Sequence, residues 1–178
     1  LWQQQDLKVQ GKNRFEQQVE RIEVDVKQHL NLPFIGLKGA AGVYAASVLV
    51  ERAEFRAFVE SSNVAIEYPG VRGFGFIERV GSGAVERFVA AQQRDGSPSF
   101  TVKNRGTGSV LYLIKFLEPA AANQSALGLN LADDPVRMQA IERAINTGKA
   151  TLSGRIELVQ DDRQRPGFVF LLPIYRQG

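Results

Sequence analysis

Few side chains in this sequence could do covalent chemistry, and none of them has the spacing for it. His29 is the single histidine of the 178 residues, and there is no cysteine, so neither a transition-metal site nor a thiol nucleophile is expected. The adjacent carboxylates Asp133-Asp134 and Asp161-Asp162 are accounted for by a helix start and a turn. No serine-hydrolase, zinc-protease or phosphate-loop motif is present. We therefore expect no catalytic residue, no metal and no cofactor.

The segment 108–131, which reads GSVLYLIKFLEPAAANQSALGLNL, has a pattern suited to binding. Its first half alternates as a strand, and alternate residues of a strand share one face. Tyr112, Ile114 and Phe116 are therefore expected on one face, and Leu111, Leu113 and Lys115 on the other. Apolar walls with a few placed hydrogen-bonding groups are typical of a small-molecule pocket, so this strand predicts one wall of such a pocket.

A polar loop follows the strand. Glu118-Pro119 is expected to end the strand, and Asn123 to hold the loop through hydrogen bonds from its side chain to the backbone. On the returning strand, Leu129 would bring an amide and a carbonyl to the pocket. The other interpretation, a core strand followed by an ordinary loop, stays open for each of these residues.

Composition excludes several classes of protein. With 44% apolar and 23% charged residues, the chain is typical of one globular domain or two small ones. The formal net charge is +3 and the basic residues are scattered, so nucleic-acid binding is not expected. The sequence has no run of about 18 apolar residues, the length that a membrane-spanning helix needs. Because the chain begins LWQQQ, without a methionine, we expect it to be part of a longer protein.

A single apolar stripe marks the first predicted helix. Between residues 14 and 30 the apolar positions are Phe15, Val19, Ile22, Val26 and Leu30, a helical spacing. The stripe is narrow and close to heptad spacing, so the helix either packs on its own domain or forms a stalk that pairs with a second copy. Pro33 is expected to interrupt or kink the helix.

The rest of the chain alternates between helix and strand patterns. Helices are predicted over residues 34–50, 51–62, 83–94 and 135–147. Strands are predicted over 71–80, 99–104, 110–117, 126–131 and 167–175, and residues 150–160 are predicted to form two short extended pieces on either side of Gly154. The helix at 135–147 has the clearest boundaries, with an Asp cap, Pro135 in the first turn and Gly148 after the last. Strands joined by short turns indicate an antiparallel sheet with helices on its flank, an α+β fold.

Four stretches, taken in order, resemble the CHASE domain family: YPGVRGFGFIERV (68–80), YLIKFLEPAAANQSALGLNL (112–131), ADDPVRMQAIERAINTGKATLSGRIELVQ (132–160) and GFVFLLPIYR (167–176). CHASE domains are extracytoplasmic sensor modules found before histidine kinases, diguanylate cyclases and related signalling proteins. The similarity is clearest between residues 51 and 175.

The resemblance implies a fold and a place in a larger receptor. A stalk helix over residues 1–32 would precede a PAS-like sensor region over residues 33–178. The stalk would mediate a homodimer. The domain would lie outside the cytoplasmic membrane, in the periplasm of a bacterium, between two transmembrane helices. A cytoplasmic output domain would follow it.

The resemblance and the strand pattern together give a set of ligand-binding candidates, which share a place on the predicted strands or their loops: Phe74, Phe76, Tyr112, Ile114, Phe116, Asn123, Leu129, Thr151, Ser153 and Phe168. Three positions qualify what the family implies. Plant cytokinin receptors recognise adenine with an aspartate between the corresponding strands, whereas Glu118 is the only acid there, so cytokinin binding is not carried over. Asn130 stands where many relatives have Asp and would bind cations less well. Ser153 keeps the hydroxyl of a pocket threonine.

Two functions are therefore considered. The first is a ligand-sensing module that binds an unidentified small molecule and signals across a membrane. The second is a dimerisation or interaction module without a ligand. Arg72, Arg105 and Lys115 lie near the predicted strands, so an anionic ligand is one option, and simple solvation of surface arginines is the other.

Overall fold

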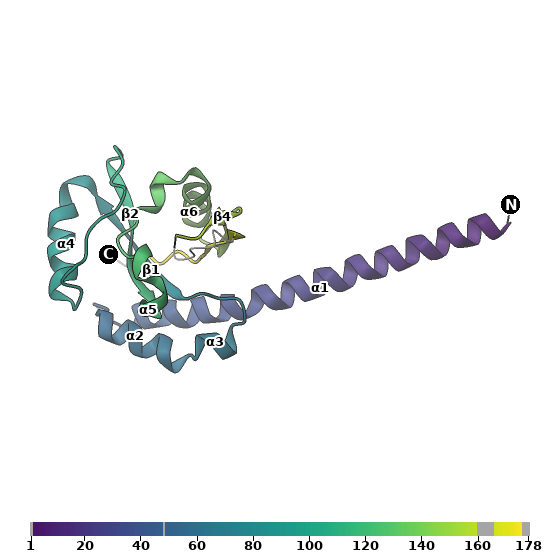
Figure 1. Cartoon of the computed structure of the whole chain (residues 1–178), viewed down its shortest axis with the longest axis horizontal. Coiled ribbons are helices and arrows are strands. Elements are labelled where there is room, and N and C mark those ends of the chain that lie inside the picture. Colours follow the sequence, from purple (N-terminus) through teal and green to yellow (C-terminus); the bar gives the residue numbers. More distant parts are fainter. Residues whose placement is uncertain (1, 48, 160–165, 176–178) are drawn as a thin grey trace.

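One long helix and a compact body make up the computed structural model of this chain (Figure 1). The structure describes residues 2–47, 49–159 and 166–175, with side chains from residue 11 onward. Helix α1 (Trp2–Ala46) extends away from the body at its N-terminal end, and its C-terminal part lies beside α2 and α3. Within the described residues no helix has the length and apolar character needed to cross a membrane.

Helix α1 continues through Pro33, so the predicted interruption is wrong. Pro33 has no amide hydrogen for the carbonyl of His29, but the helix is exposed there and water can reach that carbonyl. Beyond this point Leu37, Ala40 and Tyr44 pack against the core and hold the last turns helical. The predicted stripe stays exposed: 66% of Phe15 and 61% of Ile22 are accessible.

Two short helices continue from α1. Helix α2 (Arg52–Ser61) begins with a reciprocal cap between Glu51 and Glu54, which satisfies backbone donors at its first turn. Helix α3 (Val64–Glu67) follows. Phe55 and Val59 of α2 are almost fully buried in the core that joins these helices to the sheet.

The central sheet is an antiparallel pair, β1 (Phe74–Gly81) and β2 (Val110–Glu118), with a bulge at Lys115. Phe76 lies opposite Phe116, but the next residue of β1 lies opposite Ile114. The extra residue reverses the alternation of β2. Phe116 therefore does not share a face with Tyr112 and Ile114, and that prediction is wrong.

The two faces of the sheet bury different clusters. We call the face that carries Phe76 and Phe116 the first face; it packs on α1 and α2. Toward the other end of the strands, the same face packs on α4 (Val85–Arg94). The short 3₁₀ turn η1 (Ser82–Ala84) precedes α4. The second face carries Tyr112 and Ile114. It packs on η3 (Leu131–Asp133) and α6 (Pro135–Thr147).

The remaining predictions are confirmed for helices and only partly for strands. Asp134 caps α6, Pro135 occupies its first turn, and Gly148 ends it with a φ of 65°. Residues 99–104 and 126–131 contribute only isolated bridges to strand pairing. The C-terminal strands are short: β3 (Thr151–Leu152) pairs with β6 (Phe170–Leu171), and β4 (Ile156–Glu157) with β5 (Pro166–Gly167). The fold is α+β, as predicted.

Candidate functional site

A large open cleft is lined by α1, the sheet and the C-terminal segment. Its volume is about 1930 Å³, above the roughly 300–1,000 Å³ of a typical small-molecule site. The walls come from α1, from residues 74–79 of β1, from the second face of the sheet, from α6 and from residues 166–175. A ligand bound here would contact elements from both ends of the chain.

The apolar floor of the cleft lies on the second face. Tyr112 and Ile114 are partly buried and pack with Leu129, Leu131 and Ile141. The Ile114 amide donates to the Leu129 carbonyl at 3.1 Å, and the Leu129 amide donates to Ala126 at 3.1 Å. Leu129 therefore lines the cleft, and its amide and carbonyl each have a backbone partner within the chain.

Asn130 lies beneath this floor and supports it through hydrogen bonds, and it does not line the cleft. Its Oδ1 accepts from the amides of Tyr112 at 3.0 Å and Ala132 at 3.2 Å, and its residue is 4% exposed. These bonds tie β2 to η3. The side chain at this position is therefore used for structure.

The aromatic residues on the first face divide between core and cleft. Phe116 is fully buried against Phe55, with 5.5 Å between ring centroids, and lies outside the cleft lining. Phe74 is 4% exposed and reaches the cleft only at its edge. Phe76 is more open and stacks on Tyr44 at 4.0 Å. For Phe116 the interpretation as a core residue holds.

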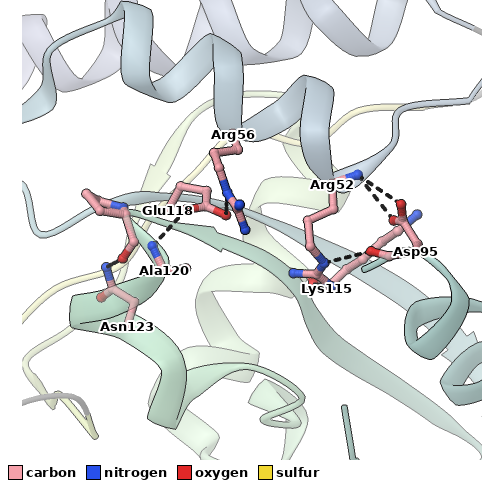
Figure 2. Close-up of polar contacts among 8 residues, drawn as sticks. Arg52, Arg56, Asp95, Lys115, Glu118, Ala120 and Asn123 are labelled. Atoms are coloured by element: carbon pink, nitrogen blue, oxygen red, sulfur yellow. Dashed lines mark hydrogen bonds and ion pairs between the residues drawn. The ribbon is translucent and has the colours of Figure 1, made fainter. Parts of the chain in front are cut away.

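The Glu118-Pro119 corner and Asn123 form a clamp beside the cleft (Figure 2). The peptide bond at this corner is cis. Glu118 is 3% exposed; its carboxylate accepts from the Ala120 amide at 2.7 Å and from Arg56 of α2 at 3.4 Å. Asn123 Nδ2 donates to the carbonyls of Pro119 at 2.9 Å and Arg72 at 3.1 Å. Asn123 holds the loop as predicted, but it does not line the cleft.

Gly73 allows the backbone before β1 to approach Glu118 and Asn123 closely. A Cβ at this position would collide with the Glu118 carbonyl and lie 2.9 Å from Nδ2 of Asn123. No side chain larger than hydrogen fits this approach of two backbones. The strand β1 is thereby fixed next to the end of β2.

A second polar group joins α2 to the bulge, and sequence reasoning missed it. Arg52 is 5% exposed; its guanidinium donates to the carbonyls of Asp95 at 3.1 Å and Lys115 at 3.2 Å (Figure 2). Burial lowers the pKa of Arg52, and the carboxylates of Asp95 and Glu118 act against this. Lys115 pairs with Glu78 at 3.1 Å.

Tyr44 of α1 lines the cleft and has a buried hydroxyl. Its Oη is buried and has no hydrogen-bond partner in the described part of the chain. Burial raises the pKa of Tyr44, and the negative charges of Glu78 and Asp95 raise it further. The hydroxyl is therefore neutral throughout the physiological range.

Of the three predicted residues in the C-terminal part of the chain, two are buried away from the cleft and one lines it. Ser153 Oγ donates to Gly154 at 2.8 Å and accepts from the Val169 amide at 2.9 Å, and Thr151 Oγ1 donates to Lys149 at 3.2 Å. Both are buried and neither lines the cleft. Phe168, 58% exposed, does line it.

The structure thus places six of the ten predicted residues on the cleft wall: Phe74, Phe76, Tyr112, Ile114, Leu129 and Phe168. Arg105, one of the three predicted basic residues, pairs with exposed Glu86 at 2.9 Å on the surface. Across the described ranges, no three metal-ligating side chains come together.

The chain was compared with protein families and with curated proteins. The family model of the CHASE domain matches residues 49–178, which begin just after α1 and include the sheet, α6 and the C-terminal segment. No curated protein matches the chain.

Proposed function

Because this chain belongs to the CHASE domain family, an extracytoplasmic sensory domain family and not a catalytic one, we propose that it binds a small molecule in the cleft and passes a change of shape to α1. The observation that carries this proposal is the composition of the cleft wall. α1, β1 and the segment 166–175 all contribute to it, so one ligand can change how these elements are placed against each other.

The ligand contacts we propose are the predicted residues that line the cleft. Tyr112, Ile114 and Leu129 offer an apolar floor, Phe76 an aromatic edge and Phe168 an exposed ring on the opposite side. The open cleft is larger than a small molecule needs. The C-terminal segment therefore closes on the ligand, which binds the closed form more tightly and shifts the population toward it.

Signal transfer follows from a contact between that segment and α1. The rings of Phe34 on α1 and Phe170 on β6 lie 6.3 Å apart, so a closing movement of β6 acts directly on the helix. Leu37, Ala40 and Tyr44 keep the same part of α1 against the core. The displacement of the C-terminal segment relative to α1 is the signal that leaves the domain.

In the full-length protein, we place this domain in the periplasm between two transmembrane helices, as a PAS-like sensor before a cytoplasmic histidine kinase or diguanylate cyclase. α1 would pair with a second copy. Its apolar stripe supports this, since Phe15 and Ile22 are 66% and 61% exposed in the single chain and the spacing suits a helix pair.

The test of sensing is a ligand-dependent melting shift. We would screen purines, amino acids and small carboxylates against the purified domain by thermal shift, since a ligand that binds only the folded state raises its melting temperature. Phe168→Ala should lose the shift caused by a hit. Ile66→Ala is the matched control, because Ile66 is also exposed, at 69%, and does not line the cleft.

The second candidate is a dimerisation module without a ligand, which the exposed stripe of α1 favours. Under this alternative no compound shifts the melting temperature, while the dimer persists and is lost on changing the stripe. A ligand shift that depends on Phe168 rules the alternative out.

A further inference from the structure

The charges on the cleft wall are strongly unequal. Among the described residues that line the cleft, the basic side chains are Arg72, Arg79, Lys115 and Arg137, and Glu78 is the acidic one. The chain as a whole is nearly balanced, with 22 basic and 19 acidic residues. The basic excess is therefore concentrated in the cleft.

One close ion pair removes part of this excess, and Arg79 and Arg137 keep N–H donors without an acceptor in the described part of the chain. Lys115 and Glu78 neutralise each other at 3.1 Å. Arg79 lies opposite Tyr112 in the sheet, on the second face, and its side chain makes no hydrogen bond or ion pair within the described ranges. Arg72 has other contacts.

Arg137 is the more unusual of the two because it is buried. Only 10% of its side chain is exposed. One N–H of Nη2 donates to the Glu157 carbonyl at 2.7 Å. Nη1 forms an ion pair with Oδ2 of Asp134 at 3.6 Å, longer than a hydrogen bond, while Oδ1 of Asp134 caps α6. In the part of the chain that the structure describes, Nε has no partner.

A buried guanidinium in this state still has donors without an acceptor. It carries five N–H donors in a planar fork that matches a carboxylate. A buried donor without an acceptor is unfavourable, and a buried charge is normally paired. Ile141, one turn further along α6, packs on the second face with Tyr112 and Ile114. Arg137 therefore stands beside the apolar floor of the cleft.

We infer that the ligand of this cleft is a small carboxylate with an apolar body, and that Arg137 determines this specificity by binding the carboxylate. The inference rests on the proposed sensing function and adds the chemical class of the ligand. The apolar body lies on Tyr112, Ile114 and Leu129. Arg79, exposed at the cleft wall, adds attraction at a distance.

The experiment compares each carboxylate with its own neutral amide. Titration calorimetry on the domain would use a panel of aliphatic and aromatic monocarboxylates, beginning with phenylacetate, and the corresponding primary amides, beginning with phenylacetamide. Because charge-assisted bonds to a guanidinium are about twice as strong as neutral ones, we expect at least one acid to bind about tenfold or more tightly than its amide.

Variants assign the difference to Arg137. Arg137→Gln should lower the affinity for the acid to about that of the amide and leave the amide unchanged. Arg143→Gln is the control, since Arg143 is an exposed arginine on the same helix and outside the cleft. If loss of the Glu157 contact unfolds Arg137→Gln, Arg137→Lys keeps the charge and should retain part of the preference. Arg79→Gln, at an exposed site, should lower the affinity slightly at low salt and make the loss of affinity with added salt less steep.

The outcomes separate this inference from the function beneath it. Amides that bind as tightly as their acids, with Arg137→Gln and Arg137→Lys both without effect, overturn the inference while the cleft remains a ligand site. A neutral purine that binds and depends on Phe168 would also overturn the inference of a carboxylate ligand, while the cleft would remain a ligand site. If no carboxylate in the panel binds at concentrations up to about 10 mM, a regime of very weak affinity, the inference is also overturned.

Discussion

Removing the amide of Asn123 should destabilise the domain by about 2–3 kcal/mol. Asn123 is 1% exposed, and its Nδ2 donates to the carbonyls of Pro119 and Arg72 at 2.9 and 3.1 Å. Each such bond contributes about 1 kcal/mol net, and the small cavity adds to the loss. Arg72 and Pro119 are themselves exposed residues, so water can reach their carbonyls and the cost stays near the lower end of the range for unsatisfied groups.

The assay is urea denaturation of Asn123→Ala, followed by circular dichroism. With a slope of about 2 kcal/mol per molar urea, the midpoint should fall by roughly 1–1.5 M. Asn146→Ala is the matched control, because Asn146 also lies near the end of a helix but is exposed. Its midpoint should stay unchanged or rise slightly, since alanine has the higher helix propensity.

A second substitution tests the direction of the hydrogen bonds. Asn123→Asp keeps the shape but replaces the donor with an oxygen, which would face two carbonyls. It should therefore destabilise the domain more than Asn123→Ala does near neutral pH. If Asn123→Asp is as stable as the unmodified domain, or if Asn123→Ala behaves like Asn146→Ala, the clamp does not hold the loop in the way described.

Three further predictions concern other contacts. Tyr44→Phe should be neutral or slightly stabilising at pH 7, because the hydroxyl has no partner in the described structure. In the unmodified domain the unfolded chain releases the Tyr44 proton near the ordinary pKa of 10.0 while the folded state keeps it, so stability should fall above that pH, and less steeply in Tyr44→Phe; equal alkaline slopes in urea titrations would argue against the burial of this phenol. Gly73→Ala should cost at least about 2 kcal/mol through collision with Glu118, whereas Gly11→Ala, in open space on α1, should stabilise by up to about 1 kcal/mol; similar thermal midpoints for the two would contradict the close approach at Gly73. Ile22→Glu should leave the stability of the monomer unchanged, since Ile22 is 61% exposed in the single chain, and abolish dimerisation in sedimentation experiments if α1 pairs; a persisting dimer would place the interface elsewhere.

The helices could be predicted from the sequence because their signals are local. Asp134, Pro135 and Gly148 act within a turn of where they stand, and the same residue types mark helix ends in most proteins. Pro33 misled the prediction because local chemistry does not include the core contacts of Leu37 and Tyr44 that keep the helix continuous.

The site was harder to predict because one inserted residue changes which side chains meet. Alternation assigns Phe116 to the face of Tyr112, and nothing in the pattern marks Lys115 as a bulge. Arg52 and Arg137 were missed for a related reason. Arginines usually lie at the surface, and only the fold shows that these two are buried.

The length of α1 has a mechanical consequence. At about 1.5 Å per residue, the part of the helix before Phe34, whose ring packs on β6, is roughly 50 Å long. The helix is therefore a lever whose short arm lies against β1 and β6. A tilt of about 5° at that arm, which requires side-chain shifts of under about 1 Å in the core, would move the distant tip by about 4 Å. A ligand needs only a slight effect on packing around Tyr44 and Phe170 to produce a movement of that size at the other end.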